Sequence, residues 1–207
     1  MNRGRFWIGA LVASIVSAGC QSDESEFAVT MEPAKEPPAA MGLLPSPQMI
    51  RPVAVGTKIQ WTPVRAADGK VVDLAKMLAN QPTVVVFYRG GWCPFCNRHL
   101  QALGGIRAQI ERTGYRLIAV SPESPEALKA TATKNDVSYD TFSDERGKLM
   151  RVFNVAFAAN EQLLPLASLF VVDRTARVRF RSWNHDYKVR MSADEVMAAI
   201  RGVSKAK

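Results

Sequence analysis

The segment from Thr83 to Cys96 constrains the fold of this chain more than any other. Residues 83–88 (TVVVFY) form an apolar, largely β-branched run without alternation, which is typical of a strand buried on both faces. A short loop, Arg89–Trp92, leads into Cys-Pro-Phe-Cys, and apolar residues then recur at helical spacing as far as Ile110. The sequence therefore predicts a buried strand that turns directly into a helix, with two cysteines at the junction.

The rest of the body alternates between strand and helix signals. The expected strands are 83–88, 117–120, 139–142, 169–172 and 178–182, and the expected helices begin near Pro94, Ser124, Ser143 and Ser192. Buried parallel strands joined by helices make an α/β sandwich, and the half-polar strand 178–182 suits an antiparallel hairpin at the sheet edge. This order predicts a single thioredoxin-like domain, with a central mixed sheet flanked by helices.

The N-terminal 20 residues (MNRGRFWIGALVASIVSAGC) are typical of a targeting segment. Arg3 and Arg5 precede an apolar stretch of 11 residues, Phe6–Val16, which is short of the about 20 needed to span a bilayer. Small residues stand before Cys20, as in a bacterial lipobox, so we expect cleavage before Cys20 and a lipid on its thiol. An ordinary signal peptide or an uncleaved anchor are the alternatives. All three predict a body outside the cytoplasm, and the lipobox predicts a membrane-anchored lipoprotein facing the periplasm.

Composition divides the remaining chain into a tether and one domain. Five prolines and few large apolar side chains occupy residues 21–48, which is typical of a semi-extended linker. We therefore expect a signal peptide at 1–19, a tether at 20–48 and the domain at 49–207. Three cysteines in 207 residues are too few for a disulfide scaffold.

The net charge of +8 identifies no partner, because the late basic residues alternate with apolar ones as on a solvated strand face. They are Arg174, Arg177, Arg179, Arg181, Lys188 and Arg190. We therefore expect no nucleic-acid partner.

The cysteine pair has the spacing of a redox-active dithiol. Cys93 stands at the start of the predicted helix, where unpaired backbone N–H groups and the helix dipole favour a thiolate, and Arg89 adds a nearby cation. Cysteines in such places have pKa values of about 3.5–7.5. Cys96 lies nearly under Cys93 and can close a disulfide, while Pro94 fits the first helical turn. We therefore expect the Cys93 thiolate to attack the substrate, and Cys96 to attack the mixed disulfide or sulfenic acid that forms on Cys93.

Other uses of the pair fit the sequence less well. Haem attachment needs a histidine after Cys96, where the chain has Asn97. Zinc needs two further ligands, and the chain has only the histidines His99 and His185. A purely structural disulfide in so short a loop stabilises little. We expect redox chemistry with no metal or cofactor.

Two residues beside the pair have two possible roles each. Trp92 either shields the disulfide and faces a partner or packs into the core, and His99 either carries protons or is an ordinary histidine.

Residues 84–97 (VVVFYRGGWCPFCN) closely resemble the peroxiredoxin-like branch of the alkyl hydroperoxide reductase/thiol-specific antioxidant (AhpC/TSA) family. The resemblance spans about residues 53–203 and continues at 68–70, 117–123, 142–144 and 170–173. It implies a thioredoxin-like fold and thiol-based reduction of peroxides or of disulfides.

The sequence also departs from that family. Its members carry proline seven residues and a hydroxyl side chain three residues before the attacking cysteine, and relative to Cys93 these positions are Val86 and Gly90. Ser168 takes the place of the cis-proline of thioredoxins, and the arginine common near there in the family is not found. We therefore expect a thiol peroxidase, recycled by a thiol reductant that the sequence does not identify. Disulfide exchange with extracytoplasmic proteins is one alternative, and a lipid-tethered binding module with a structural disulfide is another.

Overall fold

The computed structural model describes residues 43–160 and 162–205. The predicted signal peptide 1–19, the predicted lipid site Cys20 and the tether as far as residue 42 lie outside the described residues. Within the described ranges, no helix combines the length and apolar character needed to cross a bilayer.

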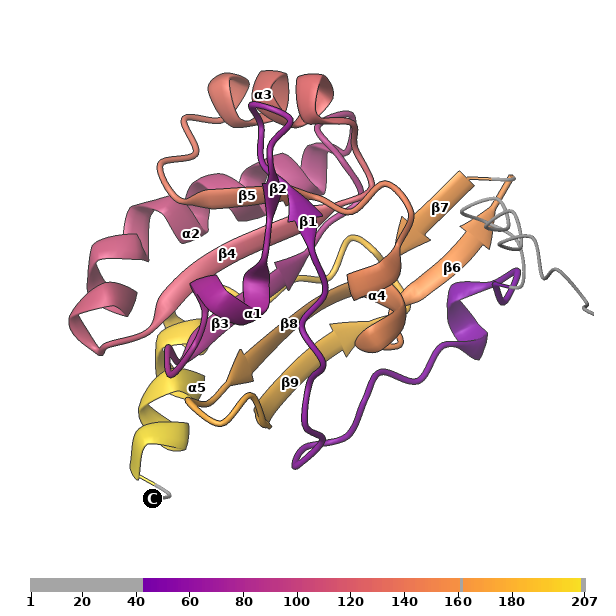
Figure 1. Cartoon of the computed structure of the whole chain (residues 1–207). Coiled ribbons are helices and arrows are strands. Elements are labelled where there is room, and N and C mark those ends of the chain that lie inside the picture. The colour runs from indigo at the N-terminus through magenta and orange to yellow at the C-terminus, as the bar shows by residue number, and fades with distance from the viewer. Residues whose placement is uncertain (1–42, 161, 206–207) are drawn as a thin grey trace, which may run out of the picture. The chain divides into compact units, whose positions relative to one another are not determined.

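A mixed sheet forms the centre of the domain (Figure 1). In the described part of the chain it has seven strands, in the spatial order β2-β1-β5-β4-β3-β8-β9. Their bounds are β1 Val64–Arg65, β2 Val71–Val72, β3 Thr83–Phe87, β4 Arg116–Ser121, β5 Asp140–Ser143, β8 Ala167–Val172 and β9 Val178–Asn184. A separate antiparallel hairpin joins β6 (Ala156–Ala159) to β7 (Gln162–Pro165). The mixed sheet confirms the predicted fold class.

The direction of β8 differs from the simplest expectation for a buried strand. β3, β4 and β5 run parallel, but β8 pairs with β3 antiparallel, with Ser168 opposite Phe87 and Val172 opposite Thr83. The sequence grouped residues 169–172 with the parallel strands, and that was wrong. A strand covered on both faces has the same apolar composition in either direction, so composition alone could not decide. The half-polar strand, now β9, pairs antiparallel with β8 at the sheet edge as predicted.

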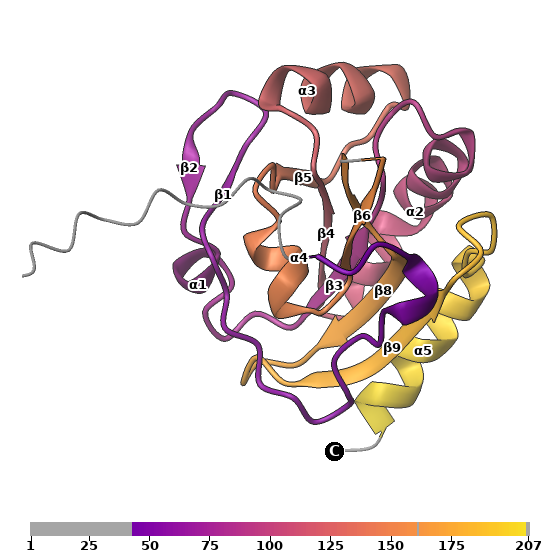
Figure 2. The same ribbon diagram turned by 90° about the vertical axis from the view of Figure 1, so that its right-hand side faces the viewer.

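Helices cover both faces of the sheet, as Figure 2 shows. The helices are α1 Leu74–Met77, α2 Pro94–Arg112, α3 Pro125–Lys134, α4 Lys148–Val152 and α5 Ala193–Lys205, with a short 3-10 turn at Pro47–Met49. Alternate residues of β3 divide the core between the two faces. Val84 and Val86 pack with α2 and α5, whereas Val85 and Phe87 pack toward α1 and α4. Both cysteines belong to the α2 side of this core.

Helix α2 follows directly from its sequence. Cys93 is the N-cap residue and Pro94 the first helical residue, where a missing N–H costs nothing. Its buried residues recur every three or four positions: Cys96, His99, Leu100, Leu103, Ile106 and Ile110. Gly114, with φ +82°, follows the end of the helix.

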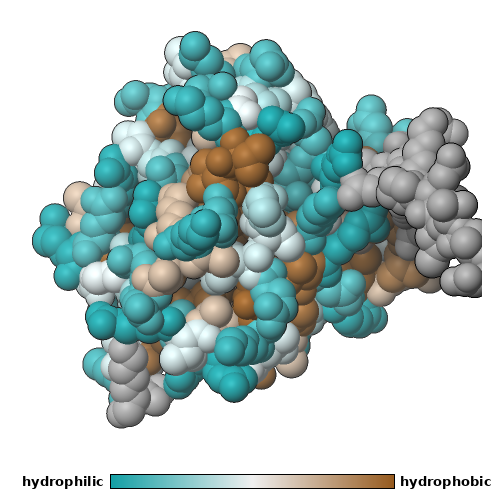
Figure 3. Space-filling model, in the orientation of Figure 1, coloured by the Kyte–Doolittle hydropathy of each residue, from teal (hydrophilic) through white to brown (hydrophobic). Residues whose placement is uncertain are grey.

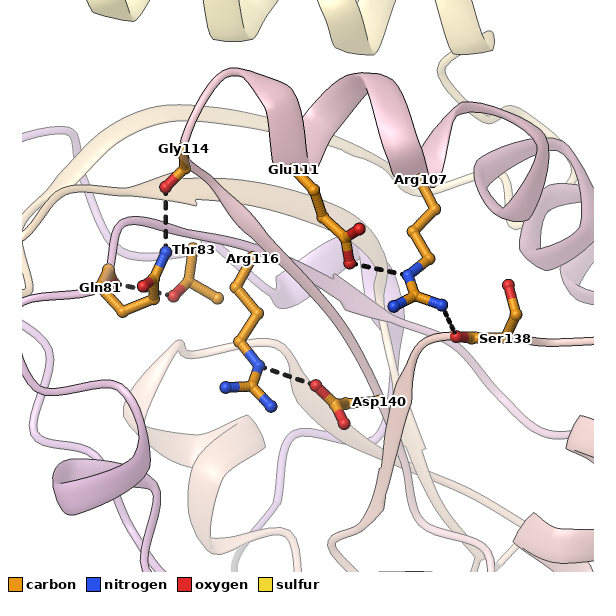
Figure 4. Close-up of polar contacts among 8 residues, drawn as sticks. All are labelled: Gln81, Thr83, Arg107, Glu111, Gly114, Arg116, Ser138 and Asp140. Carbon is orange, nitrogen blue, oxygen red and sulfur yellow. Dashed lines mark hydrogen bonds and ion pairs between the residues drawn. The ribbon is translucent and has the colours of Figure 1, made fainter.

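Polar contacts fix the end of α2 that lies farthest from the cysteines (Figure 4). Arg107 Nε donates to Glu111 at 2.7 Å within α2, and a guanidinium nitrogen of Arg107 donates to the Ser138 carbonyl. Arg116 Nε on β4 donates to Asp140 on β5 at 2.7 Å. The Arg107 contact with Ser138 ties the helix to the segment before β5, and the Arg116 contact joins β4 to β5.

Several elements were not predicted. The sequence expected a helix from about Ser143 to Phe153, but the helix begins only at Lys148, after a left-handed Gly147 (φ +65°) and an Asp144 carboxylate that accepts from the Met150 N–H at 2.9 Å. The short strands β1 and β2 and the β6–β7 hairpin were also missed. Such short strands leave too few residues for a reliable periodicity.

Residues 43–48, which the sequence assigned to the end of the tether, contact the domain. The carbonyl of Leu44 accepts from the Ala158 N–H at 2.9 Å, and Leu43 packs against the core.

On the face shown in Figure 3, an apolar patch covers the β2 strand, where Val71 is 63 % exposed.

Replacing Phe153 by alanine tests the core on the α4 side. The Phe153 ring is fully buried, with centroids 5.0 Å from Phe87, 4.8 Å from Phe170 and 5.9 Å from Trp61. We expect Phe153→Ala to lower the free energy of unfolding by about 3–5 kcal/mol in urea titrations. Val71→Ala, at an exposed site, should stay within about 0.5 kcal/mol of the parent protein. Equal losses in the two variants would contradict this packing.

Candidate active site

The junction between β3 and α2 places two thiols side by side. Cys93 and Cys96 are both free and fully buried. The backbone N–H of Cys96 donates to Cys93 Sγ at 3.3 Å, so the first thiol caps the helix that carries the second. Pro94 lies between them as the first residue of α2. The strand, the loop and the helical dithiol are therefore arranged as the sequence predicted.

A half-buried carboxylate holds the loop before the dithiol. Glu123, in the loop after β4, accepts hydrogen bonds from the Gly91 N–H (2.9 Å), the Thr131 hydroxyl (2.7 Å) and the Ser121 hydroxyl (3.0 Å). The carbonyl of Gly91 accepts from the Asn97 side chain at 2.8 Å. Both polar groups of the Gly91 backbone are thus satisfied without water. Sequence reasoning missed the role of Glu123, although it lies in a segment that carries the family resemblance.

Two adjacent positions in this loop favour glycine, Gly91 because of close approach and Gly90 because of its positive φ. A Cβ on Gly91 would lie 2.0 Å from Thr131 Oγ1, and one on Gly90, where φ is +143°, would lie 2.8 Å from Trp92 Nε1. Trp92 itself is 61 % exposed, so it is not part of the core. Of the two predicted places for Trp92, the surface beside the dithiol is the one it occupies.

The hydrogen bonds around the two sulfur atoms favour a thiolate on Cys96. The Cys93 thiol donates to Cys96, the backbone N–H of Arg89 donates to it, and Arg190 Nη2 lies 3.5 Å from its Sγ. The bond from Cys93, then the Arg89 N–H and the Arg190 charge, outweigh burial and lower the pKa of Cys96 to about 6. The pKa of Cys93 is raised, first because its thiol is the donor to Cys96 and second because it is buried.

The raised pKa of Cys93 is opposite to the lowered pKa that the sequence predicted for it. The sequence assigned the lowered pKa to the cysteine at the helix start, and the Cys96 N–H that donates there does favour a Cys93 thiolate. However, two adjacent sulfur atoms that share a hydrogen bond hold one proton between them. The negative charge belongs on the sulfur that has a guanidinium and a further N–H beside it, which is Cys96.

Arg190 is the residue that sequence reasoning placed wrongly. It was grouped with basic residues on a solvated strand face, and the only arginine expected beside the dithiol was Arg89. Arg190 lies instead between β9 and α5, donates to the Tyr187 carbonyl, and contacts Cys96 across 94 positions of sequence. A signal existed, because Arg190 stands between Val189 and Met191 directly before the α5 capping residues.

Arg89 supports the site with its backbone more than with its charge. Its N–H donates to Cys96, while its guanidinium stacks 4.3 Å above the Tyr187 ring and 5.8 Å from the Phe157 ring. The Tyr187 ring also meets Phe95 edge-on at 5.7 Å. Tyr187 and Arg190 therefore bring the segment before α5 over the first turn of α2.

Two further positions singled out in the sequence lie near the dithiol. His99 is buried one turn beyond Cys96, and burial followed by the charge of Arg190 lowers its pKa to about 4, so it is neutral at pH 7. Ser168 is buried opposite Phe87, and its hydroxyl donates to the Leu166 carbonyl at 2.9 Å. Within the described ranges, no three His, Cys, Asp or Glu side chains lie together as a metal site would need.

Titration of the reduced dithiol tests the charge distribution. In a Cys20→Ser background, alkylation by iodoacetamide should rise as the pH increases through about 6, where Cys96 loses its proton, and the second thiol should ionise only far above neutral pH. Arg190→Met should shift the first midpoint upward, because the guanidinium no longer favours the thiolate. The control Arg201→Met removes an exposed charge on α5 and should leave it unchanged. An unchanged midpoint in Arg190→Met would contradict this assignment.

Comparisons with known proteins agree on one family. The AhpC/TSA family model matches residues 55–181. Chloroplastic peroxiredoxin Q of Gentiana triflora is 28 % identical over 130 residues, which cover 63 % of this chain and 58 % of that protein. The chain thus spans less than two thirds of the first curated relatives that it matches.

Solved peroxiredoxin structures share the fold. Peroxidoxin BcpB from Mycobacterium tuberculosis superposes with a TM-score of 0.64 at 17 % identity, over 74 % of this chain and 97 % of that one. Reduced Prx3 from Vibrio vulnificus, in complex with H2O2, superposes with a TM-score of 0.66 at 15 % identity, over 72 % and 96 %. Since the family model covers more than half of the sequence and the sheet, helices and dithiol junction are in place, the chain belongs to the AhpC/TSA family.

Proposed function

We propose that this chain is a thiol peroxidase, which reduces hydroperoxides through Cys93 and Cys96. The observation that carries the proposal is the buried sulfur of Cys96, which has the Arg89 N–H and the Arg190 guanidinium beside it in an AhpC/TSA fold. With a pKa of about 6, about nine-tenths of this thiol is ionised at pH 7. The thiolate is the nucleophile that peroxide chemistry requires.

Within this function, we assign the attack to Cys96 and the resolving step to Cys93. The hypothesis from the sequence had the opposite roles, because it rested on the helix start alone. The donors around Cys96 favour it as the attacking thiolate. Cys93 keeps its proton and lies close enough to donate to Cys96, which also places it to attack a sulfenic acid formed there.

The two steps balance without a cofactor. The Cys96 thiolate attacks the terminal oxygen of a hydroperoxide, the O–O bond breaks, and the released alkoxide takes a proton to become an alcohol, or water when the substrate is hydrogen peroxide. Cys93 then attacks the Cys96 sulfenic acid, so that the S–S bond forms and water leaves. The peroxide gains two electrons, and a thiol reductant returns two electrons and two protons to the disulfide.

Burial favours a small substrate over a protein disulfide. Neither thiol has exposed surface, so a partner's disulfide cannot contact either sulfur without a large opening of the site. A hydroperoxide is small, so it needs only a small opening of the site to contact a sulfur atom. A structural disulfide, the remaining alternative, has no need of a guanidinium beside one sulfur atom.

Peroxide kinetics test both the function and the roles. Reduced protein mixed with hydrogen peroxide in a stopped-flow instrument should lose its thiols far faster than free cysteine does. Cys93→Ser should still form a sulfenic acid, trapped by dimedone, whereas Cys96→Ser should lose at least about 100-fold in rate, as expected when a largely ionised thiol is replaced. The reverse pattern would return the attack to Cys93. Slow reaction with peroxide but rapid reduction of insulin disulfides would favour exchange instead.

We also propose that a lipid on Cys20 tethers the domain to a membrane outside the cytoplasm. The support is the sequence of residues 1–20. Expressed in a bacterial host with radiolabelled palmitate, the full chain should carry label and sediment with membranes. Cys20→Ser should lose the label, because the thiol that accepts the lipid is gone. An unlabelled, freely released wild-type protein would contradict the tether while leaving the peroxidase proposal intact.

A further inference from the structure

A small polar cavity lies behind the dithiol, between α2, the strands β8 and β9, and residues 189–191. Its volume is about 150 Å³. Polar side chains supply much of its lining: His99, Ser168, Ser182, Asn184, Arg190 and Glu195. We call it the His99 cavity. It has room for a few water-sized molecules, and a long acyl chain would have to extend out of it into solvent.

The cavity contains an unused hydrogen-bond acceptor. His99 is 8 % exposed, and its Nε2 is buried without a partner among the described residues. The ring also makes a hydrogen bond with the Met191 backbone. The imidazole is neutral at pH 7, because burial and the charge of Arg190 hold its pKa near 4. A neutral ring that donates through one nitrogen must accept through the other. Nε2 therefore presents a lone pair that can accept from an O–H or N–H of a molecule in the cavity.

The same cavity contains an unused donor. Arg190 Nε is buried and, within the described ranges, has no partner, while Nη2 of the same guanidinium lies 3.5 Å from Cys96 Sγ. Glu195 does not satisfy either group, since its carboxylate accepts from the backbone N–H and the hydroxyl of Ser192. An unpaired donor and an unpaired acceptor thus line one small space, and the donor belongs to the residue that touches the attacking sulfur.

We propose that the His99 cavity binds a small hydroperoxide on its way to Cys96, with His99 Nε2 accepting the peroxide O–H and Arg190 Nε donating to a peroxide oxygen. A hydroperoxide carries an O–H donor directly beside an oxygen acceptor, which matches this pair of groups. Leaving both buried groups unpaired is costly, and the ligand removes that cost. The inference rests on the proposed peroxidase function and adds to it a place of binding and a preference for small substrates.

The volume of the His99 cavity indicates which hydroperoxides it can hold. Hydrogen peroxide and short alkyl hydroperoxides fit wholly within about 150 Å³, whereas the chain of a fatty-acid hydroperoxide would extend beyond the cavity and bury little of its apolar surface there. Arg190 spans the distance between the cavity and the thiolate, so movement of its flexible side chain would bring a bound peroxide toward Cys96. His99 would bind and orient the substrate through a hydrogen bond, and it would neither gain nor lose a proton.

Two substitutions of His99 separate this role from a structural one. His99→Gln places an amide oxygen near the position of Nε2 and so can keep the acceptor, but it loses the bond to Met191. His99→Asn can keep the Met191 bond but has no acceptor in the cavity. We expect His99→Asn to lower the rate with hydrogen peroxide about tenfold, and His99→Gln to stay within about threefold of wild type. Iodoacetamide alkylation of Cys96 should remain normal in both variants.

The opposite ranking, with His99→Gln impaired and His99→Asn normal, would mean that His99 only supports the Met191 segment, and would overturn the proposal. Normal rates in both variants would mean that the cavity holds nothing more than water, and would overturn it too. If wild-type protein reacts with no hydroperoxide faster than free cysteine does, the proposed function fails first. The two failures are therefore distinguishable.

A substrate series tests the size limit without changing His99. Wild-type rates should fall from hydrogen peroxide through tert-butyl hydroperoxide to a linoleic acid hydroperoxide. Ser182→Leu fills part of the cavity from β9, and it should lower the rate with tert-butyl hydroperoxide more than the rate with hydrogen peroxide. Equal rates for all three substrates in wild-type protein would contradict a peroxide site in this cavity.

A binding measurement covers the case in which the His99 variants fail to fold. The chain has two histidines, so the ring nitrogens of ¹⁵N-labelled protein can be assigned by NMR with a single His185 variant. In Cys93→Ser/Cys96→Ser protein, adding hydrogen peroxide should shift the Nε2 resonance of His99 and leave that of His185 in place. No shift of His99 at any concentration would overturn the proposal.

Discussion

The position of the dithiol depends on one carboxylate. Glu123 accepts three hydrogen bonds, one of them from the Gly91 backbone, and so fixes the loop through which β3 enters α2. Without it, the Gly91 N–H would lose its partner, in a loop that has no room for a side chain at that residue. The first turn of α2, and with it the geometry of Cys93 and Cys96, follows from this contact.

The charge at the site depends on a second contact, made from the other end of the chain. A thiolate removed from water needs donors in place of water, and the Cys96 sulfur has the Arg89 N–H and the Arg190 guanidinium. Burial is the main cause of the lowered pKa of His99, and the same cation adds to it, so the arginine that favours a thiolate also favours a neutral imidazole. The two effects have the same sign, because a positive charge favours the form of each group that carries less positive charge.

Much of the fold could be predicted from local pattern. Apolar runs and caps located β3, β4, α2 and α5, because burial imposes its period on neighbouring residues. Long-range properties could not be read in this way. The antiparallel direction of β8 depends on its pairing with β3, and the cation that lies beside Cys96 is Arg190, 94 residues away in the sequence. The sequence identified both cysteines, but it could not bring the Arg190 guanidinium to Cys96, since that contact is not local.

The order of the chain has a consequence for how the site matures. β3 and α2 are made early, but β8, which pairs with β3 in the centre of the sheet, and Arg190 come from the last fifth of the sequence. Such pairings have high contact order and form late in folding. Until they form, Cys96 has no cation beside it and neither thiol is covered. The reactivity that the folded protein directs at one sulfur is thus acquired only when the C-terminal strands and α5 have assembled, and an incomplete chain would hold two ordinary, unprotected thiols.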